Sequence, residues 1–262
     1  MPGTWSSALV TGASSGIGRA MARRLAAAGT DLVVVARDTE RLEALAKEVA
    51  AAGSGATVEV LTADLADPAA LATVEARLAD AARPIDLLVN NAGFGTYGTF
   101  DELPVDGEER EIRVNVVAVV RLAHAALRAM KARGRGTILN VGSVAGLQAT
   151  PGNATYGATK AFVASFSESL HEETKGTGVV VSQVLPGFTR TEFQERAGIQ
   201  GREIPSFAWM DVDACARLAL EAAAAGKPFY VPGAFNKLAA TALDLGPRPL
   251  LRRVGARLAR RL

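Results

Sequence analysis

The sequence contains one cysteine, Cys215, and two histidines among its 262 residues. A single cysteine excludes an intrachain disulfide and any metal cluster built on several thiolates, and it fits a reducing compartment. His124 and His171 have neither the spacing of metal ligands nor a Ser-His-acid arrangement around them. We therefore expect no metal site, packing or surface roles for both histidines, and a small buried apolar role for Cys215.

An excess of charge of one sign is also lacking. The formal net charge is +2, from 29 Lys and Arg against 27 Asp and Glu, which is too balanced for a general nucleic-acid-binding protein. Six of the arginines follow Gly246 and no acidic residue does, so residues 1–246 carry 23 basic and 27 acidic side chains, a charge of −4. The basic excess therefore belongs to the C-terminal tail.

Long hydrophobic runs are absent as well. No stretch of about 20 apolar residues occurs, so we expect no membrane span. The first residues lack a basic region followed by an apolar run, so we also expect no signal peptide and a cytoplasmic location. The 49% hydrophobic and 21% charged residues are nevertheless sufficient for a globular core.

Short apolar segments alternate with longer amphipathic ones, which is typical of a parallel sheet covered by helices on both faces. We predict one doubly wound, mostly parallel α/β domain of the Rossmann type over residues 1–232, with about seven strands. The expected strands are residues 8–11, 31–36, 57–62, 87–90, 136–141, 179–185 and 229–231. The expected helices are residues 16–28, 39–52, 68–81, 105–132, 155–175 and 211–225.

Two segments depart from this alternation. Residues 191–210 mix apolar side chains with Gly and Pro, and they form either a lid or part of a small helical core. Residues 233–262 are expected to form a basic, amphipathic helical extension. Its Arg-rich end either packs on the protein or binds an acidic membrane surface. An earlier apolar face, suited to packing on the domain or on a partner subunit, consists of Phe235, Leu238, Ala242 and Leu245.

The segment TGASSGIG follows the first predicted strand and opens the first predicted helix. Glycine permits a tight turn and close backbone approach, and the N–H groups at a helix N-terminus bind pyrophosphate well. The segment, with Gly12, Gly16 and Gly18, is therefore predicted to hold the phosphates of a dinucleotide. Its spacing differs from the commonest dinucleotide fingerprint, and an ordinary strand-to-helix turn is the alternative.

Arg37 follows the second predicted strand, where NAD-binding units usually have an acidic residue for the ribose 2′-hydroxyl. Arg37, with Arg41 one helical turn later, would instead pair with a 2′-phosphate, so the sequence favours NADP over NAD. A solvated surface arginine is the alternative. Asp64, after the third predicted strand, either accepts a hydrogen bond from an adenine amino group or caps the helix that begins near Pro68.

Several polar residues follow the later strands, at the edge where open α/β sheets bind ligands. They are NNAG at residues 90–93, Asn115, Ser143, Tyr156 and Lys160. Together with TGASSGIG and PGFTRT at residues 186–191, their order and spacing closely resemble a classical short-chain dehydrogenase/reductase over residues 6–231.

Tyr156 and Lys160 are four residues apart and therefore share one helix face. A nearby ammonium favours the phenolate, so we expect Lys160 to lower the pKa of Tyr156 and to activate it as the acid/base. In this chemistry the phenol exchanges a proton with the substrate oxygen while a nicotinamide exchanges hydride with the carbon. A structural Tyr, Ser and surface Lys are the alternative.

The family resemblance implies further roles. Ser143 would hydrogen-bond the substrate oxygen, Asn115 would hold a water connected to Lys160, and Lys160 would contact the nicotinamide ribose. Thr191 would contact the cofactor or, alternatively, cap the following turn. The expected NADP-binding residues are Gly12, Ser14, Ser15, Gly16, Ile17, Gly18, Arg37, Asp64, Leu65, Asn91, Gly93, Tyr156, Lys160, Thr189 and Thr191.

The candidate walls of the substrate pocket are mostly apolar. They are Phe94, Gly95, Tyr97, residues 144–147, Asn153, Phe188 and the segment 191–210. We therefore expect an NADPH-dependent oxidoreductase for a lipophilic ketone, secondary alcohol or 3-oxoacyl-type substrate. An NADP sensor or scaffold with little turnover is one alternative, and the same enzyme attached to a membrane through its tail is another.

In the family that this chain resembles, many classical members end soon after the last strand, with a Gly-rich terminus that supports tetramers. This chain instead continues past its last predicted strand. We therefore expect a homodimer built on the helices that contain Asn115 and Tyr156, with a tetramer as the alternative.

Overall fold

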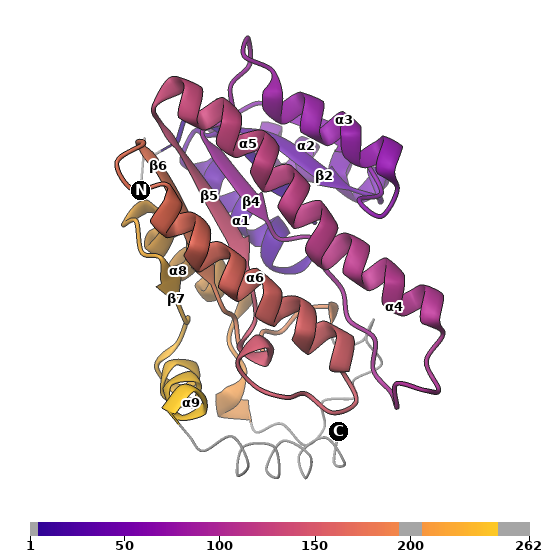
Figure 1. Cartoon of the computed structure of the whole chain (residues 1–262). Helices are drawn as coiled ribbons and strands as arrows, with labels where there is room; N and C mark the ends of the chain where they lie inside the picture. The colour runs from indigo at the N-terminus through magenta and orange to yellow at the C-terminus, as the bar shows by residue number, and fades with distance from the viewer. Residues whose placement is uncertain (1–4, 194–205, 246–262) are drawn as a thin grey trace.

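Seven parallel strands form one sheet in the computed structural model, which describes residues 5–193 and 206–245 (Figure 1). The strand order is β3-β2-β1-β4-β5-β6-β7. The strands are β1 (Ser7–Thr11), β2 (Asp31–Ala36), β3 (Val58–Thr62), β4 (Leu87–Asn90), β5 (Gly136–Val141), β6 (Val179–Val184) and β7 (Phe229–Tyr230). The predicted Rossmann-type fold class is confirmed, with each strand within two residues of its expected bounds.

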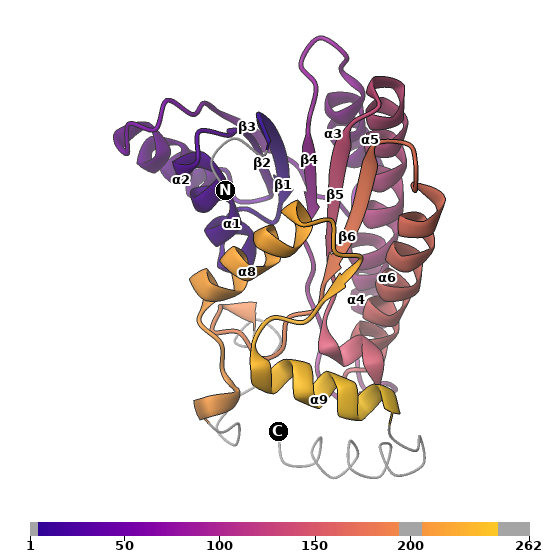
Figure 2. The same ribbon diagram turned by 90° about the vertical axis from the view of Figure 1, so that its left-hand side faces the viewer.

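Helices cover both faces of this sheet (Figure 2). They are α1 (Gly16–Ala27), α2 (Thr39–Ala51), α3 (Pro68–Ala79), α4 (Val105–Ile112), α5 (Val119–Arg133), α6 (Ala154–Glu173), α8 (Val212–Ala224) and α9 (Ala234–Leu245). α1, α2 and α8 pack on one face, and α3, α5 and α6 pack on the other. Successive strand residues alternate between the two cores: Ala8 and Val10 join the first, and Leu9 joins the second.

The strand order reverses direction between β1 and β4, which are hydrogen-bonded neighbours in the sheet. The connections from β1 and β4 leave in opposite directions there and open a crevice at the carboxyl ends of the strands. Ligands of doubly wound folds bind at such a switch point. The topology therefore puts the segments after β1 and β4 at the same edge.

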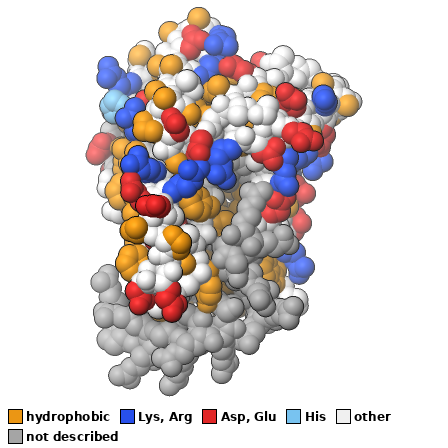
Figure 3. Space-filling view, turned by 90° about the vertical axis from the view of Figure 1, so that its right-hand side faces the viewer, with side chains coloured by type: hydrophobic (Ala, Val, Ile, Leu, Met, Phe, Trp, Pro, Cys, Tyr) orange, Lys and Arg blue, Asp and Glu red, His pale blue; other side chains and the backbone are white. Residues whose placement is uncertain are grey.

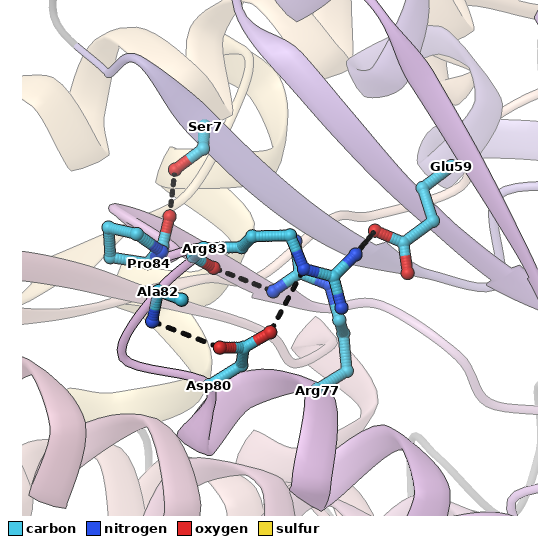
Figure 4. Close-up of polar contacts among 7 residues, drawn as sticks. All are labelled: Ser7, Glu59, Arg77, Asp80, Ala82, Arg83 and Pro84. Carbon is cyan, nitrogen blue, oxygen red and sulfur yellow. Dashed lines mark hydrogen bonds and ion pairs between the residues drawn. The ribbon is translucent and has the colours of Figure 1, made fainter.

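The opposite end of the sheet is held by a polar cluster between α3, β3 and the segment before β4 (Figure 4). Arg77 donates hydrogen bonds to Glu59 Oε2 at 2.9 Å and to the carbonyl oxygen of Arg83 at 2.7 Å. Ser7 donates to the carbonyl oxygen of Pro84 at 2.6 Å. These contacts hold the amino-terminal ends of the strands together, at the end of the sheet opposite the carboxyl edge.

The C-terminal helix α9 does not pack on the domain through its expected apolar face, where that face is described. Phe235 and Leu238 are 48% and 71% exposed, so packing of this face on a partner subunit stays a prediction. Asn236 and Ala240 are the buried side chains instead, and the Asn236 amide donates to the carbonyl oxygen of Pro232 at 3.2 Å. The Arg-rich residues after Gly246 lie outside the described residues.

The segment 191–210 is described only at its two ends. Thr189 and Met210 form a parallel β-bridge, and the Phe188 and Trp209 rings lie 5.7 Å apart. A short 3-10 turn covers Ser206–Ala208, in which Ala208 is buried. The choice between lid and core for residues 194–205 falls outside the described residues.

Candidate active site

A cleft of about 810 Å³ opens at the carboxyl ends of β1, β2, β4 and β5. Most of the predicted site residues line it: Gly12, Ser14, Ser15, Gly16, Ile17, Arg37, Asp64, Leu65, Asn91, Gly93, Ser143, Tyr156, Lys160 and Thr191. Gly18, Asn115 and Thr189 are buried behind this wall. The fold thus brings residues from the whole length of the domain into one cavity.

The loop between β1 and α1 leaves no room for side chains at two of its glycines. A Cβ on Gly12, where φ is +67°, would lie 2.8 Å from Asn91 Nδ2, and one on Gly18 would lie 2.5 Å from the Gly12 oxygen. The Asn91 amide donates to the Thr11 carbonyl oxygen at 2.9 Å and fixes the loop against β4.

The first turn of α1 fits an anionic group. Ser15 is its N-cap but makes no capping hydrogen bond with its side chain, and the turn holds no acidic residue. The backbone N–H groups of this turn therefore receive no hydrogen bond from the Ser15 side chain. They face the cleft at the positive end of the helix dipole. This cradle fits the pyrophosphate of a dinucleotide.

The basic residues after β2 have different surroundings. Arg37 lies exposed on the cleft wall. Arg41 donates two hydrogen bonds to Glu192, at 2.9 and 2.7 Å, and also pairs with Asp38. The Glu192 carboxylate raises the pKa of the Arg41 guanidinium. Of the two arginines predicted to meet a 2′-phosphate, Arg37 is the one within the cavity.

Asp64 does not cap the following helix, so that alternative is wrong. Asp67 is the N-cap of α3 and accepts from Ala69 N and Ala70 N at 2.7 and 2.9 Å. Asp64 instead accepts from Ala66 N at 3.0 Å and forms an ion pair with Arg110 of α4. Desolvation opposes ionisation of Asp64, but the hydrogen bonds from Ala66 and Arg110 and the charges of Arg110 and Arg37 outweigh it, so the pKa of Asp64 is lowered.

Ser143, Tyr156 and Lys160 converge on the cleft from β5 and α6. Ser143 hydrogen-bonds to Tyr156, and the Lys160 ammonium lies 5.6 Å from the centre of the Tyr156 ring. Lys160 also donates to the carbonyl oxygen of Val141 at 3.0 Å. The geometry presents a phenol, a hydroxyl and an ammonium to one point in the cavity.

The pKa of Tyr156 is raised, whereas the sequence led us to expect a lowered pKa. Burial raises the pKa of Tyr156 to about 12, although the hydrogen bond with Ser143 opposes the shift. Burial also lowers the pKa of Lys160 to about 8. The expected net lowering of the Tyr156 pKa is not seen, because desolvation outweighs the groups that stabilise the phenolate. At neutral pH the phenol keeps its proton.

Asn115 lies in a π-helical turn, Arg113–Ala118, that joins α4 to α5. The expected helix over 105–132 thus contains a local break in its hydrogen-bond pattern, a feature common at functional sites. The buried Asn115 amide donates to the Phe94 carbonyl oxygen at 2.8 Å and to Thr159 Oγ1 at 3.1 Å. It thereby connects this turn to the segment after β4 and to α6.

Two side chains of the expected wall segment 191–210 make specific contacts at the site. Phe193 lies over Tyr156 with ring centroids 5.3 Å apart, and Glu192 accepts hydrogen bonds from Arg41.

Two further site residues were not predicted. Glu108 and Glu111, on α4, are buried close to the catalytic helix. The spacing of one helical turn between Glu111 and Asn115 could have indicated Glu111 as a site residue, because it puts both residues on the same helix face. The sequence placed Glu192 and Phe193 in an expected wall segment but did not indicate which residues they contact.

The remaining predictions for single residues concern the histidines and the cysteine. His124 is exposed, and His171 Nδ1 hydrogen-bonds to the Val181 carbonyl oxygen at 2.7 Å, so both lie away from the cleft. Cys215 is buried in α8, and burial raises its pKa to about 11. Among the described residues no cluster of His, Cys, Asp or Glu is arranged to hold a metal ion, and no helix is long and apolar enough to cross a membrane.

Comparisons with known proteins agree with this geometry. Residues 6–200 match the family model for short chain dehydrogenase. The 3-oxoacyl-(acyl-carrier-protein) reductase of Escherichia coli is 36% identical over 202 residues, which cover 73% of this chain and 79% of that protein.

Two solved structures are similar over almost their whole length. A short-chain dehydrogenase from Sphingobium yanoikuyae in complex with NADPH is 43% identical, with a TM-score of 0.84 over 91% of this chain and 92% of that one. A bulky-bulky ketone specific alcohol dehydrogenase from Comamonas testosteroni is 36% identical, with a TM-score of 0.78 over 92% and 93%.

Proposed function

The chain belongs to the short-chain dehydrogenase family, whose members are oxidoreductases acting on carbonyl and alcohol groups, and from this premise we propose that it is an NADPH-dependent carbonyl reductase. We propose a lipophilic ketone or 3-oxoacyl-type compound as its substrate. The observation that carries this proposal is the convergence of Ser143, Tyr156 and Lys160 in a cleft that also holds Arg37.

The proposed mechanism assigns one role to each polar group. The nicotinamide, when bound, supplies the hydride. Ser143 and Tyr156 both hydrogen-bond the substrate carbonyl oxygen and so orient it, and the protonated phenol of Tyr156 transfers its proton to that oxygen. The Lys160 ammonium stabilises the negative charge that this transfer leaves on the phenol.

Two features of the cofactor end support NADPH. The glycine cradle and the uncapped start of α1 suit a pyrophosphate. Arg37, on the cavity wall, forms no ion pair within the described residues and is able to pair with a 2′-phosphate. The similar protein from Sphingobium yanoikuyae, which binds NADPH, adds support.

The substrate end is lined by apolar groups, which supports a lipophilic carbonyl compound. Phe94, Gly95 and Phe193 line the cleft beside Tyr156. A Cβ on Gly95 would lie 3.0 Å from the Tyr156 ring, so glycine lets the segment after β4 approach the phenol. The names of two similar proteins, a bulky-bulky ketone specific alcohol dehydrogenase and a 3-oxoacyl-(acyl-carrier-protein) reductase, agree with this class.

Kinetics on a carbonyl panel test the proposal. We expect the full-length protein to oxidise NADPH with ketones or 3-oxoacyl thioesters, and Tyr156→Phe to lower kcat by about 10²–10⁴-fold, because the variant lacks the donated proton. Tyr230→Phe, on β7 at the far edge of the sheet, is the matched control and retains activity. Binding of NADPH without turnover on any member of the panel would contradict the proposal and favour a cofactor sensor.

A further inference from the structure

A buried acidic pair lies beside the catalytic groups but has no role in the mechanism above. Glu108 and Glu111 lie on one face of α4 and are 5% and 0% exposed. Buried carboxyl groups are uncommon without a cationic partner, because desolvation disfavours their charged form. In the described part of the chain neither forms an ion pair. Both contact Thr96, in the segment after β4, instead.

The hydrogen bonds around Thr96 indicate which carboxyl holds a proton. The Thr96 hydroxyl lies 2.5 Å from Glu108 Oε1 and 3.1 Å from Glu111 Oε2. It has one proton and donates it to Glu108, which also accepts from the Thr155 hydroxyl. The Thr96 hydroxyl also reaches Glu111 Oε2, but its one proton cannot fully satisfy two carboxylates, so the charge of Glu111, at the longer contact, is the less well stabilised of the two.

The environment of Glu111 agrees with this assignment. Its Oε2 accepts from Thr96 N at 3.0 Å, while its buried Oε1 has no hydrogen-bond partner among the described residues. An ionised oxygen without a partner costs more free energy than a neutral one. Burial, together with the charge of Glu108, raises the pKa of Glu111 to about 7. Its ionisation therefore falls within the working range of an enzyme.

This pair is connected to the catalytic helix. Thr155, which donates to Glu108, directly precedes Tyr156, and Asn153 at the start of α6 donates to the Thr96 carbonyl oxygen. The ionisable groups that face Glu111 are Glu108 from its own helix and Tyr156 and Lys160 from α6. Residues 94–96, packed against it after β4, contribute no ionisable side chain.

We propose that Glu111 is a positioning residue for the catalytic pair: a buried carboxyl that exchanges between a protonated and an ionised form, and whose ionisation favours the charged form of Lys160 and the protonated form of Tyr156. This inference rests on the reductase function proposed above. Glu111 acts through these two groups and need not touch the substrate.

The sign of the effect is the same for both catalytic groups. A negative charge nearby stabilises an ammonium and destabilises a phenolate, so ionised Glu111 raises the pKa of both Lys160 and Tyr156. Reduction needs a charged lysine and a protonated phenol. Ionised Glu111 therefore extends reductive activity to higher pH.

The pH profile of reductive kcat/KM tests the inference. In Glu111→Gln the charge is lost, and we expect the alkaline midpoint to move to lower pH by about one unit, the size produced by one charge several ångströms away in a protein interior. Glu111→Asp retains a carboxylate and is expected to keep most of the wild-type midpoint. Glu109→Gln removes an exposed carboxylate from the same helix, where it pairs with Arg113, and is the matched control.

An unchanged midpoint in Glu111→Gln, or an equal shift in Glu109→Gln, would overturn the inference. Infrared difference spectra of the full-length wild-type protein provide a second measurement that needs no variant and no substrate. Between about pH 6 and 8.5 we expect loss of one buried protonated carboxyl band, and its absence would overturn the inference as well. A protein that shows this band but reduces no carbonyl compound would contradict the proposed function and leave the protonation of Glu111 supported.

Discussion

At the scale of single residues, Arg37 and Arg41 show how context separates two similar side chains. Arg41 is held by two hydrogen bonds from its guanidinium to Glu192, and both side chains are less than half exposed. A guanidinium that already has a carboxylate partner must give up this pair before it binds a phosphate. Arg37 forms no ion pair in the described structure, although its charge helps to lower the pKa of Asp64, so we infer that it contributes more to NADPH binding.

Replacement of Arg37 tests the cofactor preference. In Arg37→Ala we expect the KM for NADPH to rise about 10–100-fold, because hydrogen bonds to charged groups contribute about 1.5–3 kcal/mol each, while the KM for NADH changes little. Steady-state kinetics with both cofactors measure this difference. Arg41→Ala is the comparison variant and is expected to raise the KM for NADPH less. Equal losses with NADPH and NADH would contradict a contact between Arg37 and the 2′-phosphate.

The sequence predicted which residues meet in the cleft better than it predicted their protonation. Ser143, Tyr156 and Lys160 were predictable because parallel strands end at one edge and residues four apart share a helix face. The pKa of Tyr156 depends on burial by segments distant in sequence, including Phe193, and no local pattern encodes that burial. The contact between Arg41 and Glu192 joins residues 151 positions apart and was equally hidden.

At the scale of secondary-structure elements, the buried strands were predictable from their continuous apolar runs. The packing of helix α9 was less predictable from the sequence. Its apolar residues fit an amphipathic pattern, but the structure buries Asn236 and leaves Phe235 exposed. Asn236 fits there because Gly187 has no side chain, and a Cβ on Gly187 would lie 2.4 Å from Asn236 Oδ1. A contact of this kind is decided by tertiary packing, which periodicity does not report.

The turn between β1 and α1 supports a prediction about stability. A Cβ on Gly18 would lie 2.3 Å from Asn91 Nδ2, so we expect Gly18→Ala to lower the free energy of unfolding by about 1–3 kcal/mol and to weaken NADPH binding. Urea denaturation and fluorescence titration with NADPH measure the two effects. Gly107→Ala, within α4, meets open space and is expected to raise the free energy of unfolding by about 0.5–1 kcal/mol. Similar stability of the two variants would contradict the close packing of this turn.

At the scale of the whole molecule, surface charge does not single out an interface on the face seen in Figure 3. The face on the side of α4 carries acidic and basic side chains interspersed with hydrophobic ones (Figure 3). Exposed apolar side chains are more informative. Phe162 on α6 and Val117 in the adjoining π-helical turn are 41% and 42% exposed, and Phe162 stacks on Phe166 with ring centroids 5.7 Å apart. Exposed apolar groups on neighbouring helices favour an interface with a second copy of the chain.

We propose a homodimer through these helices, and substitutions on α6 and α9 test it against an interface on α9. A twofold interface contains each residue twice, so Phe162→Glu introduces two buried charges and is expected to convert the dimer to a monomer. Leu238→Glu, at the exposed face of α9, is the matched control and is expected to leave the dimer intact. Size-exclusion chromatography with light scattering measures the mass of each variant. If Leu238→Glu dissociates the protein and Phe162→Glu does not, the interface lies on α9, and the apolar face that fails to pack on its own domain serves the partner subunit instead.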